Sequence, residues 1–596
     1  MTFTPAPAFT TRPTLTGTFG MSASTHWLAT ACAQAVLERG GNAFDAAVAG
    51  AFVLHVVEPH LNGPGGDMTG LFATAADPGT PVVLMGQGPA PAGATIEHMR
   101  AEGLDLVPGA GGLAAAVPGA VDAWLMLLRD HGTLELPDVL GYTIGYARDG
   151  HPLLPSAAAT IARVAELFRD HWPTSAALWM PGGEVPAAGT VMRNPAYAAV
   201  LESLVAAGAD AEDRRSRIEA ARREWRTGTV AHAASIFLST RHRHSTGTDH
   251  AAVIAPDDFA GFEASYEEPA TAGFRGHTIA KTPGWGQGPV LLQALRLLEG
   301  LEDERLDPST ELGAHTVLEA LKLALADRDA YYGDGDVPLD ELLSDAYTAA
   351  RRDLIGDDAS HRWRPGTVQG REPFRPPLRG AADAATGPGT GEPTVAKTGE
   401  TRGDTCHIDV VDRWGNIISA TPSGGWLQSS PAIPELGFCL GTRLQMTWLD
   451  EASPSALRPG SRPRTTLSPT LVLRDGRAVI ALGTPGGDQQ DQWQLPALLR
   501  MLVGGYAPQQ AIDAPMLHTT ALVDSFWPRT YEVAGVVAED RLGDAVISGL
   551  EARGHAVTRA GAWSLGRLSA VGIDPDTGLL WAAANARGAQ GYAAGR

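Results

Sequence analysis

The stretch TCHIDVVDRWGNIISAT, residues 405–421, decides the fold that we expect for this chain. Two short runs rich in β-branched residues, 406–411 and 417–421, flank a Gly-Asn turn, and this pattern predicts a β-hairpin. The preceding segment, about 357–404, is rich in Pro, Gly, Thr and charge and poor in large apolar residues, which predicts a mobile linker. We therefore expect a flexible connection that ends at a strand whose first residue is Thr405.

Helices are predicted on the N-terminal side of this hairpin. The Ala-rich run 27–37 predicts one helix, and Asn42 is placed to cap a second over 43–57. The second helix is apolar on nearly every side, so we expect it to be buried. A third helix, about 315–331, has apolar residues at helical spacing and is predicted to be amphipathic. No period of about 20 to 50 residues repeats, which argues against a solenoid.

Composition narrows the compartment and the partners. The chain has 596 residues, 44% of them hydrophobic, and a net charge of −21. This charge repels phosphate backbones and anionic lipid, so neither nucleic acid nor a membrane is expected as a partner. Three sparse cysteines, Cys32, Cys406 and Cys439, fit a reducing compartment better than a disulfide framework. With no secretory signal visible at the start, the sequence predicts a cytoplasmic protein.

Thr405 has an ordinary structural role if it is taken alone, because β-branched residues favour strands. Its place directly after a linker suggests a second role. A chain-terminal Thr attacks an acyl carbon through its hydroxyl, while its own α-amine, with a pKa of about 7.7 to 8, takes the proton. Such a terminus would arise by self-cleavage of the Asp404–Thr405 bond. Downstream, the turn 485–487 (PGG) could direct backbone N–H groups at an oxyanion, or could be an ordinary hairpin turn.

Motifs in a fixed order along almost the whole chain resemble those of γ-glutamyltranspeptidases. They are GGNAFDAAV (40–48), EPH (58–60), GPGG (63–66), VPG (117–119), ADR (326–328), LLS (342–344), TCH (405–407), VVD (410–412), GN (415–416), LSPT (467–470) and PGG (485–487). The resemblance implies an α+β fold, an αββα four-layer sandwich of the N-terminal-nucleophile hydrolase type. It also implies cleavage into a large subunit, 1–404, and a small subunit, 405–596, which together form one domain.

The same resemblance assigns roles to individual residues. It implies that Thr405 is both nucleophile and α-amine base, that Gly486 and Gly487 form the oxyanion hole, and that the Ser423 hydroxyl supports the nucleophile. Cys406 and His407 are neighbours on a strand, so alternation places them on opposite faces. Because no Cys/His spacing in the sequence supports zinc, we expect no metal, and no other cofactor is implied.

Only some of the residues that bind the glutamate group of the substrate in the family are kept in this chain. Gln87 aligns with the arginine that holds the substrate α-carboxylate, Gly425 replaces an asparagine that holds the α-amine, and the run 440–446 lacks the corresponding aspartate. Two hydroxyls are kept as Thr465 and Thr466, with Arg464 before them. A neutral amide cannot replace a charge-assisted pair, so the pocket is predicted to differ from the family's.

The run 488–493 (DQQDQW) is unusually polar beside an expected core strand. With Trp426, Gln445 and Trp448 it suggests a pocket of amides and indoles; a solvent-facing loop is the alternative. The predicted substrate-binding residues are Gln87, Arg464, Thr465, Thr466, Gln445 and Asp488.

The leading functional hypothesis is a self-processing hydrolase or acyltransferase that passes through a Thr405 ester of a small-molecule substrate and is not selective for γ-glutamyl groups. Three alternatives stay open. One is a carbon–carbon bond hydrolase similar to the family homologues in 4-alkylproline antibiotic biosynthesis, another is a true γ-glutamyl hydrolase or transpeptidase, and the third is a non-catalytic scaffold. The sequence leaves open whether the two subunits assemble into a higher oligomer.

Overall fold

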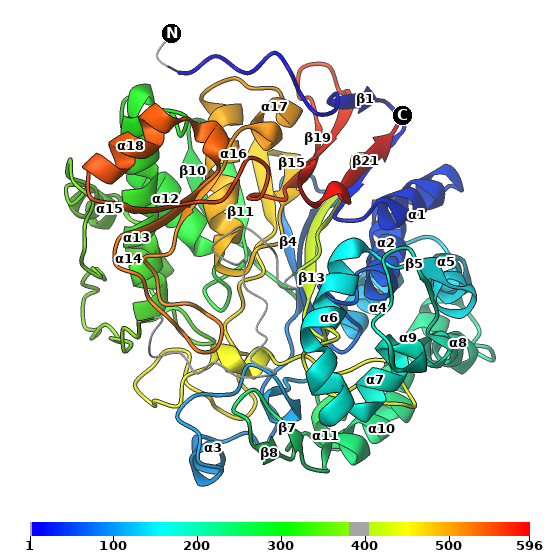
Figure 1. Ribbon diagram of the computed structural model, residues 1–596. Helices are drawn as coiled ribbons and strands as arrows, with labels where there is room; N and C mark the ends of the chain where they lie inside the picture. The colour runs from blue at the N-terminus through cyan, green and yellow to red at the C-terminus, as the bar shows by residue number, and fades with distance from the viewer. Residues whose placement is uncertain (1–2, 381–404) are drawn as a thin grey trace.

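The computed structural model describes residues 3–380 and 405–596, and within these ranges two seven-stranded sheets form the centre of the molecule (Figure 1). We call the first the hairpin sheet. In spatial order its strands are β21 (Tyr592–Gly595), β2 (Gly20–Ser24), β12 (Ile408–Asp412), β13 (Ile417–Ser423), β3 (Asp67–Ala73), β4 (Val82–Gly86) and β9 (Ser265–Glu267).

We call the second the turn sheet. Its strands, again in spatial order, are β1 (Leu15–Gly17), β20 (Leu580–Ala584), β19 (Ser569–Ile573), β15 (Arg477–Gly483), β14 (Thr470–Arg474), β11 (His277–Lys281) and β10 (Ala270–Phe274). Every pairing within these two sheets is antiparallel. Smaller sheets are formed by β16 (Leu517–Thr519), β17 (Gly535–Ala538) and β18 (Ala556–Arg559), by β5 (His151–Pro152) and β6 (Val191–Met192), and by β7 (His242–Arg243) and β8 (Asp249–His250).

The two large sheets contact each other through polar side chains as well as apolar ones. Ser419 of β13 donates a hydrogen bond to the carbonyl of Leu482 in β15 (3.0 Å), and Ser569 of β19 donates to Asp409 of β12 (2.8 Å). Figure 1 shows helices α1, α2 and α4 on the outer side of the hairpin sheet and α12, α13 and α16 on the outer side of the turn sheet. The packing of the two sheets therefore places the hairpin, which belongs to one sheet, next to the segment after β15, which belongs to the other.

The predicted hairpin is confirmed. Strands β12 and β13 pair from Ile408 with Ala420 to Val411 with Ile417. The regular strand begins at Ile408, so the expectation that Thr405 is its first residue is wrong. Thr405 nevertheless continues the ladder as an isolated bridge to Ser423, and the Cys406 N–H donates to the Pro422 carbonyl at 2.9 Å.

The first two predicted helices are also confirmed. They are α1 (Trp27–Glu38) and α2 (Ala43–Val57). The Asn42 side chain accepts hydrogen bonds from the N–H groups of Phe44 and Asp45, and it is the N-cap of α2. Every residue of α2 is buried, because the helix packs against α1, α4 and β12.

The third predicted helix exists as α13 (Glu311–Tyr331), and it begins four residues earlier than expected. The prediction that it is amphipathic is wrong, since all of residues 313–331 are buried. Helices α12 (Pro289–Leu298) and α18 (Asp544–Ala552) cover it, and its charged side chains are paired within the protein. Asp327, for example, accepts a hydrogen bond from Arg351.

The remaining helices surround these elements. They are α3 (Ile96–Ala101), α4 (Ala120–His131), α5 (Leu136–Asp149), α6 (Pro155–Asp170), α7 (Pro173–Trp179), α8 (Pro195–Ala207), α9 (Arg214–Thr227), α10 (Thr229–Leu238), α11 (Pro256–Ala260), α14 (Leu339–Leu342), α15 (Asp345–Arg352), α16 (Gln490–Leu502) and α17 (Pro508–Asp513).

The predicted linker is described only in part. Residues 357–380 carry neither helix nor strand, but they are bonded to α13: the Gly366 N–H donates to Asp327 (2.6 Å) and the Phe374 N–H to the Ala330 carbonyl (3.3 Å). The rest of the predicted linker, 381–404, including Asp404, lies outside the described residues.

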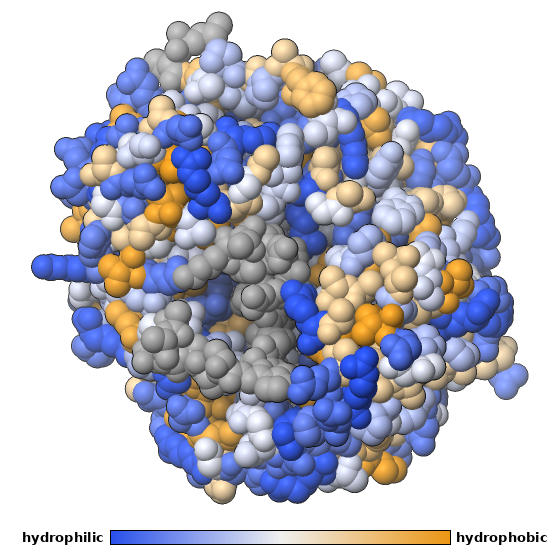
Figure 2. Space-filling model, viewed as in Figure 1, coloured by the Kyte–Doolittle hydropathy of each residue, from blue (hydrophilic) through white to orange (hydrophobic). Residues whose placement is uncertain are grey.

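Hydrophilic residues predominate on the face seen in Figure 2, with hydrophobic residues in small separate groups. Among the described helices, none is long and apolar enough to span a bilayer. The three cysteines are buried and form no disulfide.

Candidate active site

Thr405 lies where the hairpin sheet meets the loop that follows β13. Its side chain is 1% exposed, and its Oγ1 donates a hydrogen bond to the Ser423 Oγ at 3.3 Å. Ser423 is in turn paired with Asp67 at the start of β3. The pairing of three strands thus fixes the two hydroxyls that the sequence predicted to act together.

The residues after Thr405 anchor it on both faces of its strand. The Cys406 thiol donates to Glu58 (3.0 Å), which also accepts hydrogen bonds from Thr25 and Gln590. Burial raises the pKa of Glu58. On the other face, His407 lies 2.8 Å from both Thr421 Oγ1 and Asp409 Oδ1.

The opposite facing of Cys406 and His407 is therefore confirmed. No role was predicted for Glu58 beyond its place in the EPH motif, although it follows directly on the apolar run that forms α2. A carboxylate at the end of a helix that is predicted to be buried indicates a paired, buried acidic group, and this pattern was visible in the sequence.

The segment after β15 changes direction at two glycines. Gly486 and Gly487 have φ of 136° and 51°, a region that favours glycine, and a Cβ on Gly486 would lie 2.3 Å from the Trp493 ring. A short 3-10 helix, Gly487–Gln489, then leads into α16. The alternative of an ordinary hairpin turn is wrong, because a helix follows. The N-terminus of a helix favours negative charge, which suits an oxyanion.

Asp488 ties this turn to two other parts of the chain. Its carboxylate accepts hydrogen bonds from Arg328 of α13 and from the N–H and hydroxyl of Ser525 (2.8 and 2.6 Å). Burial opposes ionisation of Asp488, but Arg328 and Arg464 outweigh it and hold the pKa below its ordinary value. Both oxygens are engaged, so Asp488 positions the turn. Arg328 belongs to the ADR motif but was given no role from the sequence.

The polar run that contains Asp488 is buried, so the solvent-facing alternative is wrong. Asp491 forms an ion pair with Lys281 of β11 (3.0 Å), and Gln490 accepts a hydrogen bond from the Ser468 N–H (2.9 Å). Gln492 exchanges hydrogen bonds with Thr519. These side chains join α16 to neighbouring strands and loops.

Gln87 follows β4 and is fully buried. Its Nε2 donates to the Gly88 carbonyl (3.2 Å), whereas its Oε1 accepts no hydrogen bond from the described residues. Thr465 Oγ1 accepts from the Leu467 N–H (3.3 Å). Over the same parts of the chain, no hydrogen bond joins Gln87 to Arg464, Thr465 or Thr466, so the structure does not bring these predicted residues together directly.

The segment 523–531 contacts several other residues of the predicted pocket. No role was predicted for this segment from the sequence. Arg464 donates to Ser525 (2.8 Å), and the Trp527 N–H donates to Gln445 (3.1 Å). Trp426 packs with Met446 and Phe526. The Arg529 guanidinium stacks on Trp448, 4.1 Å from the ring centroid. The sequence signal for its part in the pocket is a short run with two aromatic residues and an arginine (SFWPR, 525–529).

Another residue that sequence reasoning missed is Arg443, within the run 440–446. It makes a bidentate ion pair with Asp67, with both N···O distances at 2.7 Å and both side chains buried. This run therefore contributes an arginine whose charge is already neutralised.

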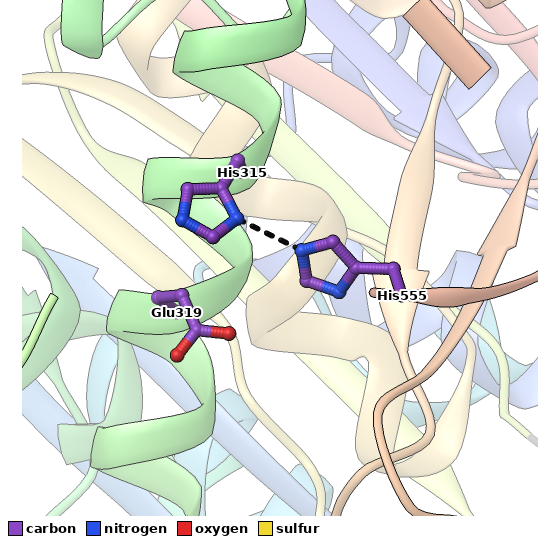
Figure 3. Close-up of side chains that lie close together, drawn as sticks. All are labelled: His315, Glu319 and His555. Atoms are coloured by element: carbon purple, nitrogen blue, oxygen red, sulfur yellow. Dashed lines mark hydrogen bonds between the residues drawn. The ribbon is translucent and has the colours of Figure 1, made fainter. Parts of the chain in front are cut away.

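One group of side chains resembles a metal site in geometry. His315, Glu319 and His555 lie close together, with His315 Nδ1 3.0 Å from His555 Nε2 (Figure 3). Glu319 already accepts hydrogen bonds from Lys322 and Arg364. A divalent cation would add to a surplus of positive charge here, so the charges around this group oppose a metal.

The two sheets, the covering helices and a buried Thr at the start of the hairpin define a mixed helix-and-sheet protein with the N-terminal-nucleophile hydrolase fold. The chain belongs to the γ-glutamyltranspeptidase family: the family model described as Gamma-glutamyltranspeptidase matches residues 29–595. The resemblance found in the sequence is thereby confirmed.

Three similar proteins illustrate the range of the family. The solved structure of a protein called LmbA2991HD is 52% identical, with a TM-score of 0.93 and coverage of 99% of this chain and 100% of that one. The "Oxamate amidohydrolase proenzyme" of Klebsiella pneumoniae is 30% identical, covering 97% of this chain and 98% of its own. The "Glutathione hydrolase-like YwrD proenzyme" of Bacillus subtilis is 29% identical, covering 96% and 98%. These names support a self-processing hydrolase.

Proposed function

We propose that this chain is a self-processing hydrolase or acyltransferase in which Thr405 is the nucleophile. The observation that carries the proposal is the hydrogen bond between the buried Thr405 and Ser423 hydroxyls, directly after Asp404, in a γ-glutamyltranspeptidase-family chain. The proposed architecture is an αββα four-layer sandwich, in which residues 1–404 and 405–596 remain together as one domain after cleavage.

Self-cleavage would begin with attack of the Thr405 hydroxyl on the Asp404 carbonyl carbon. The new C–O bond replaces the peptide C–N bond, the hydroxyl proton passes to the leaving nitrogen, and an ester joins Asp404 to the Thr405 oxygen. Water then hydrolyses this ester and leaves an Asp404 carboxylate and a free Thr405 α-amine.

Turnover would use the same hydroxyl on the substrate carbonyl, with the α-amine taking the proton. The Gly486 and Gly487 N–H groups would stabilise the oxyanion, which is a large part of the rate enhancement in acyl transfer. Ser423 would hold the Thr405 hydroxyl in place. Water is the expected acceptor of the acyl group.

We propose further that γ-glutamyl groups are not the preferred substrates. Gln87 offers a neutral amide where the family has an arginine, and its Oε1 is an acceptor, which a substrate carboxylate cannot use. Arg443 stands in the run that lacks the family aspartate, and Asp67 neutralises it. Loss of a charge-assisted hydrogen bond at a buried site costs about 1.5–3 kcal/mol.

A denaturing gel of the purified protein tests the nucleophile. We expect two bands, for residues 1–404 and 405–596, and N-terminal sequencing of the smaller one should begin at Thr405. A Thr405→Ala variant should give a single band. Cleavage of this variant at the same bond would refute the assignment, and a wild-type chain that stays whole and is not acylated by an electrophilic glutamine analogue would favour a scaffold.

The substrate proposal needs a separate assay. The processed enzyme is offered a γ-glutamyl anilide beside a panel of simple amides and vinylogous keto acids, with Thr405→Ala as the blank. We expect the enzyme to turn over at least one compound of the panel faster than it turns over the anilide. Turnover of the anilide at least as fast as that of every other compound would show that the glutamyl preference is retained.

A further inference from the structure

A row of polar side chains is buried between the two large sheets and ends at the proposed nucleophile. Thr405, His407 and Asp409 alternate along one segment, so they share one face of the hairpin sheet. On the neighbouring strand, Ser423 lies opposite Thr405 and Ser419 lies opposite Asp409. Each of these side chains is at most 1% exposed. Polar groups buried this deeply are stable where each meets a partner inside the protein.

His407 lies in the middle of this row, and its imidazole rests against the turn sheet. A Cβ on Gly483, the last residue of β15, would lie 2.2 Å from the Cε1 atom of His407. A glycine is therefore needed for the ring to fit at this place. Thr405 precedes His407 by two residues, and Gly486 follows Gly483 by three. One side chain thus bridges the nucleophile segment and the strand that leads to the oxyanion turn.

The partners of His407 fix the orientation of its ring. Asp409 Oδ1 lies 2.8 Å from Nε2, and Ser419 Oγ lies 3.3 Å from the same nitrogen. Ser419 already donates its hydrogen to the Leu482 carbonyl, so both oxygens accept and Nε2 carries a hydrogen. The other nitrogen, Nδ1, is bonded to Thr421 Oγ1 at 2.8 Å. An imidazole bonded at both nitrogens cannot tilt without losing a buried hydrogen bond.

Asp409 joins the same two sheets a second time. Its Oδ2 accepts a hydrogen bond from Ser569 of β19 at 2.8 Å. Ser569 is the residue that pairs with Gly483 in the turn sheet. The His407 ring and the Asp409 carboxylate therefore contact neighbouring strands at the same level. Two such contacts, side by side, fix the separation of the sheets at the point where β15 ends.

A serine, a histidine and an aspartate this close together could suggest a second catalytic group. In a catalytic triad, however, the serine and the aspartate bond different nitrogens of the imidazole. Here Ser419 and Asp409 both lie beside Nε2 of His407. All three side chains are fully buried, so a substrate does not reach them. The geometry favours a positioning role over a second centre of chemistry.

We propose that His407 and Asp409 are positioning residues that set the distance between the Thr405 hydroxyl and the turn 486–487. Donors of an oxyanion hole must lie about 2.7–3.1 Å from the oxyanion, and a misplacement of about 1 Å can slow a reaction about a hundredfold. The inference rests on the proposed function for the roles of Thr405 and of the turn. It adds the contact that keeps the two aligned, although they belong to different sheets.

Hydrogen exchange tests the alignment without turnover. Amide exchange is followed by mass spectrometry in the full chain, with Thr405→Ala in every sample so that all chains stay whole. We expect His407→Leu and Asp409→Ala to raise exchange at least about tenfold in peptides that cover 405–410 and 483–490. Peptides from α5 should be unchanged. Unchanged exchange over 483–490, or an equal rise throughout the chain, would overturn the proposal.

The rate of self-cleavage links the alignment to the chemistry. His407→Leu and Asp409→Ala should cleave at least about tenfold more slowly than the wild type. His407→Gln keeps a donor for Asp409, and Asp409→Asn keeps an oxygen for Nε2, so both should recover most of the rate. The matched control is Ser22→Ala, because Ser22 is also buried in the hairpin sheet but bonds to Thr30 of α1. Wild-type rates in His407→Leu and Asp409→Ala would contradict the positioning role.

Gly483→Ala probes the contact from the turn sheet. The added Cβ would overlap the imidazole of His407, so we expect self-cleavage to slow at least about tenfold. Gly273→Ala, in β10 of the same sheet, is the control, since the nearest atom to its added Cβ is 4.0 Å away. The double variant Gly483→Ala/His407→Asn has room for the Cβ and should cleave no more slowly than His407→Asn alone. Effects that multiply in the double variant would refute a shared contact.

Folding is checked by the melting temperature of each variant. If His407→Leu or Asp409→Ala does not fold, His407→Gln and Asp409→Asn take its place, with a smaller rise in exchange expected over 483–490 alone. No rise in either of these variants would overturn the proposal. The two proposals fail separately. Cleavage at Thr405 that is insensitive to the variants refutes only this inference, and a local rise in exchange in a chain that never cleaves refutes only the proposed function.

Discussion

Thr405 and Ser423 are positioned by strand pairing, and each hydroxyl has the other within hydrogen-bonding distance. Both side chains are buried, so water does not simply replace the contact if one hydroxyl is removed. The next two residues, Cys406 and His407, lie on opposite faces of the strand and are bonded to Glu58 and to Asp409. These contacts fix the backbone from which the Thr405 hydroxyl projects.

Ser423→Ala should slow self-cleavage about two- to tenfold, because one buried hydrogen bond of about 0.5–1.5 kcal/mol to the nucleophile is lost. The rate is measured as the disappearance of the full-length band with time after rapid purification. Ser423→Thr is the matched control, since it keeps a hydroxyl at the same position, and it should cleave at close to the wild-type rate. Equal rates in Ser423→Ala and wild type would show that Ser423 does not support the nucleophile.

At the scale of elements, the loop 63–66 between α2 and β3 packs directly on the loop after β13. A Cβ on Gly63 would lie 2.2 Å from the Gly425 carbonyl oxygen, and one on Gly66 would lie 2.1 Å from the Ser423 carbonyl oxygen. Only glycine permits this approach of one backbone to another. The GPGG motif and the glycines after Ser423 are therefore two halves of one contact.

Gly66→Ala should displace Ser423 and so impair both folding and self-cleavage. We expect a loss of stability of about 1–3 kcal/mol, as for other overpacked sites, and slower appearance of the small subunit. The measurements are the melting temperature and the cleavage time course. Gly141→Ala is the control, because Gly141 lies in helix α5 with no atom within 4 Å of its added Cβ; it should be neutral or slightly stabilising. A Gly66→Ala protein as stable and as active as this control would contradict the packing argument.

At the scale of the whole molecule, the core holds several neutral histidines. Burial lowers the pKa of His26, His55, His60 and His518 to about 3 each. In the unfolded chain these groups titrate at their ordinary pKa of about 6.5. Because the folded pKa is the lower one, their contribution to stability is present above pH 6.5 and is lost as the pH falls toward 3.

The melting temperature should therefore fall steeply between pH 7.5 and pH 5.5. Each of the four histidines loses about 1.4 kcal/mol over this interval, so together they lose about 5 kcal/mol, which is comparable with the total stability of many proteins. His518→Gln should remove about 1.4 kcal/mol of this loss, whereas His232→Gln, at an exposed position, should leave the loss unchanged. A melting temperature that is constant from pH 7.5 to 5.5 would contradict this account.

The sequence by itself determined the local elements, the order of the motifs and hence the family. The cap at Asn42, the apolar run after it and the Gly-Asn turn of the hairpin act over a few residues, and such signals depend on backbone geometry and local hydrogen bonds. The same information placed Thr405 beside a strand and identified the changed residue at Gln87. The roles of Thr405, Gly486 and Gly487 stay predictions until cleavage is measured.

Only the tertiary structure decided which polar residues are buried and what each one meets. Arg328 and Asp488 are separated by 160 positions and Arg464 and Ser525 by 61, yet each pair is in contact. The helix α13 was expected to be amphipathic and is buried all round, because elements distant in sequence cover its polar face as well. Side-chain pairing over such distances is set by how the sheets and helices pack, and burial is what makes an internal partner necessary for each polar side chain.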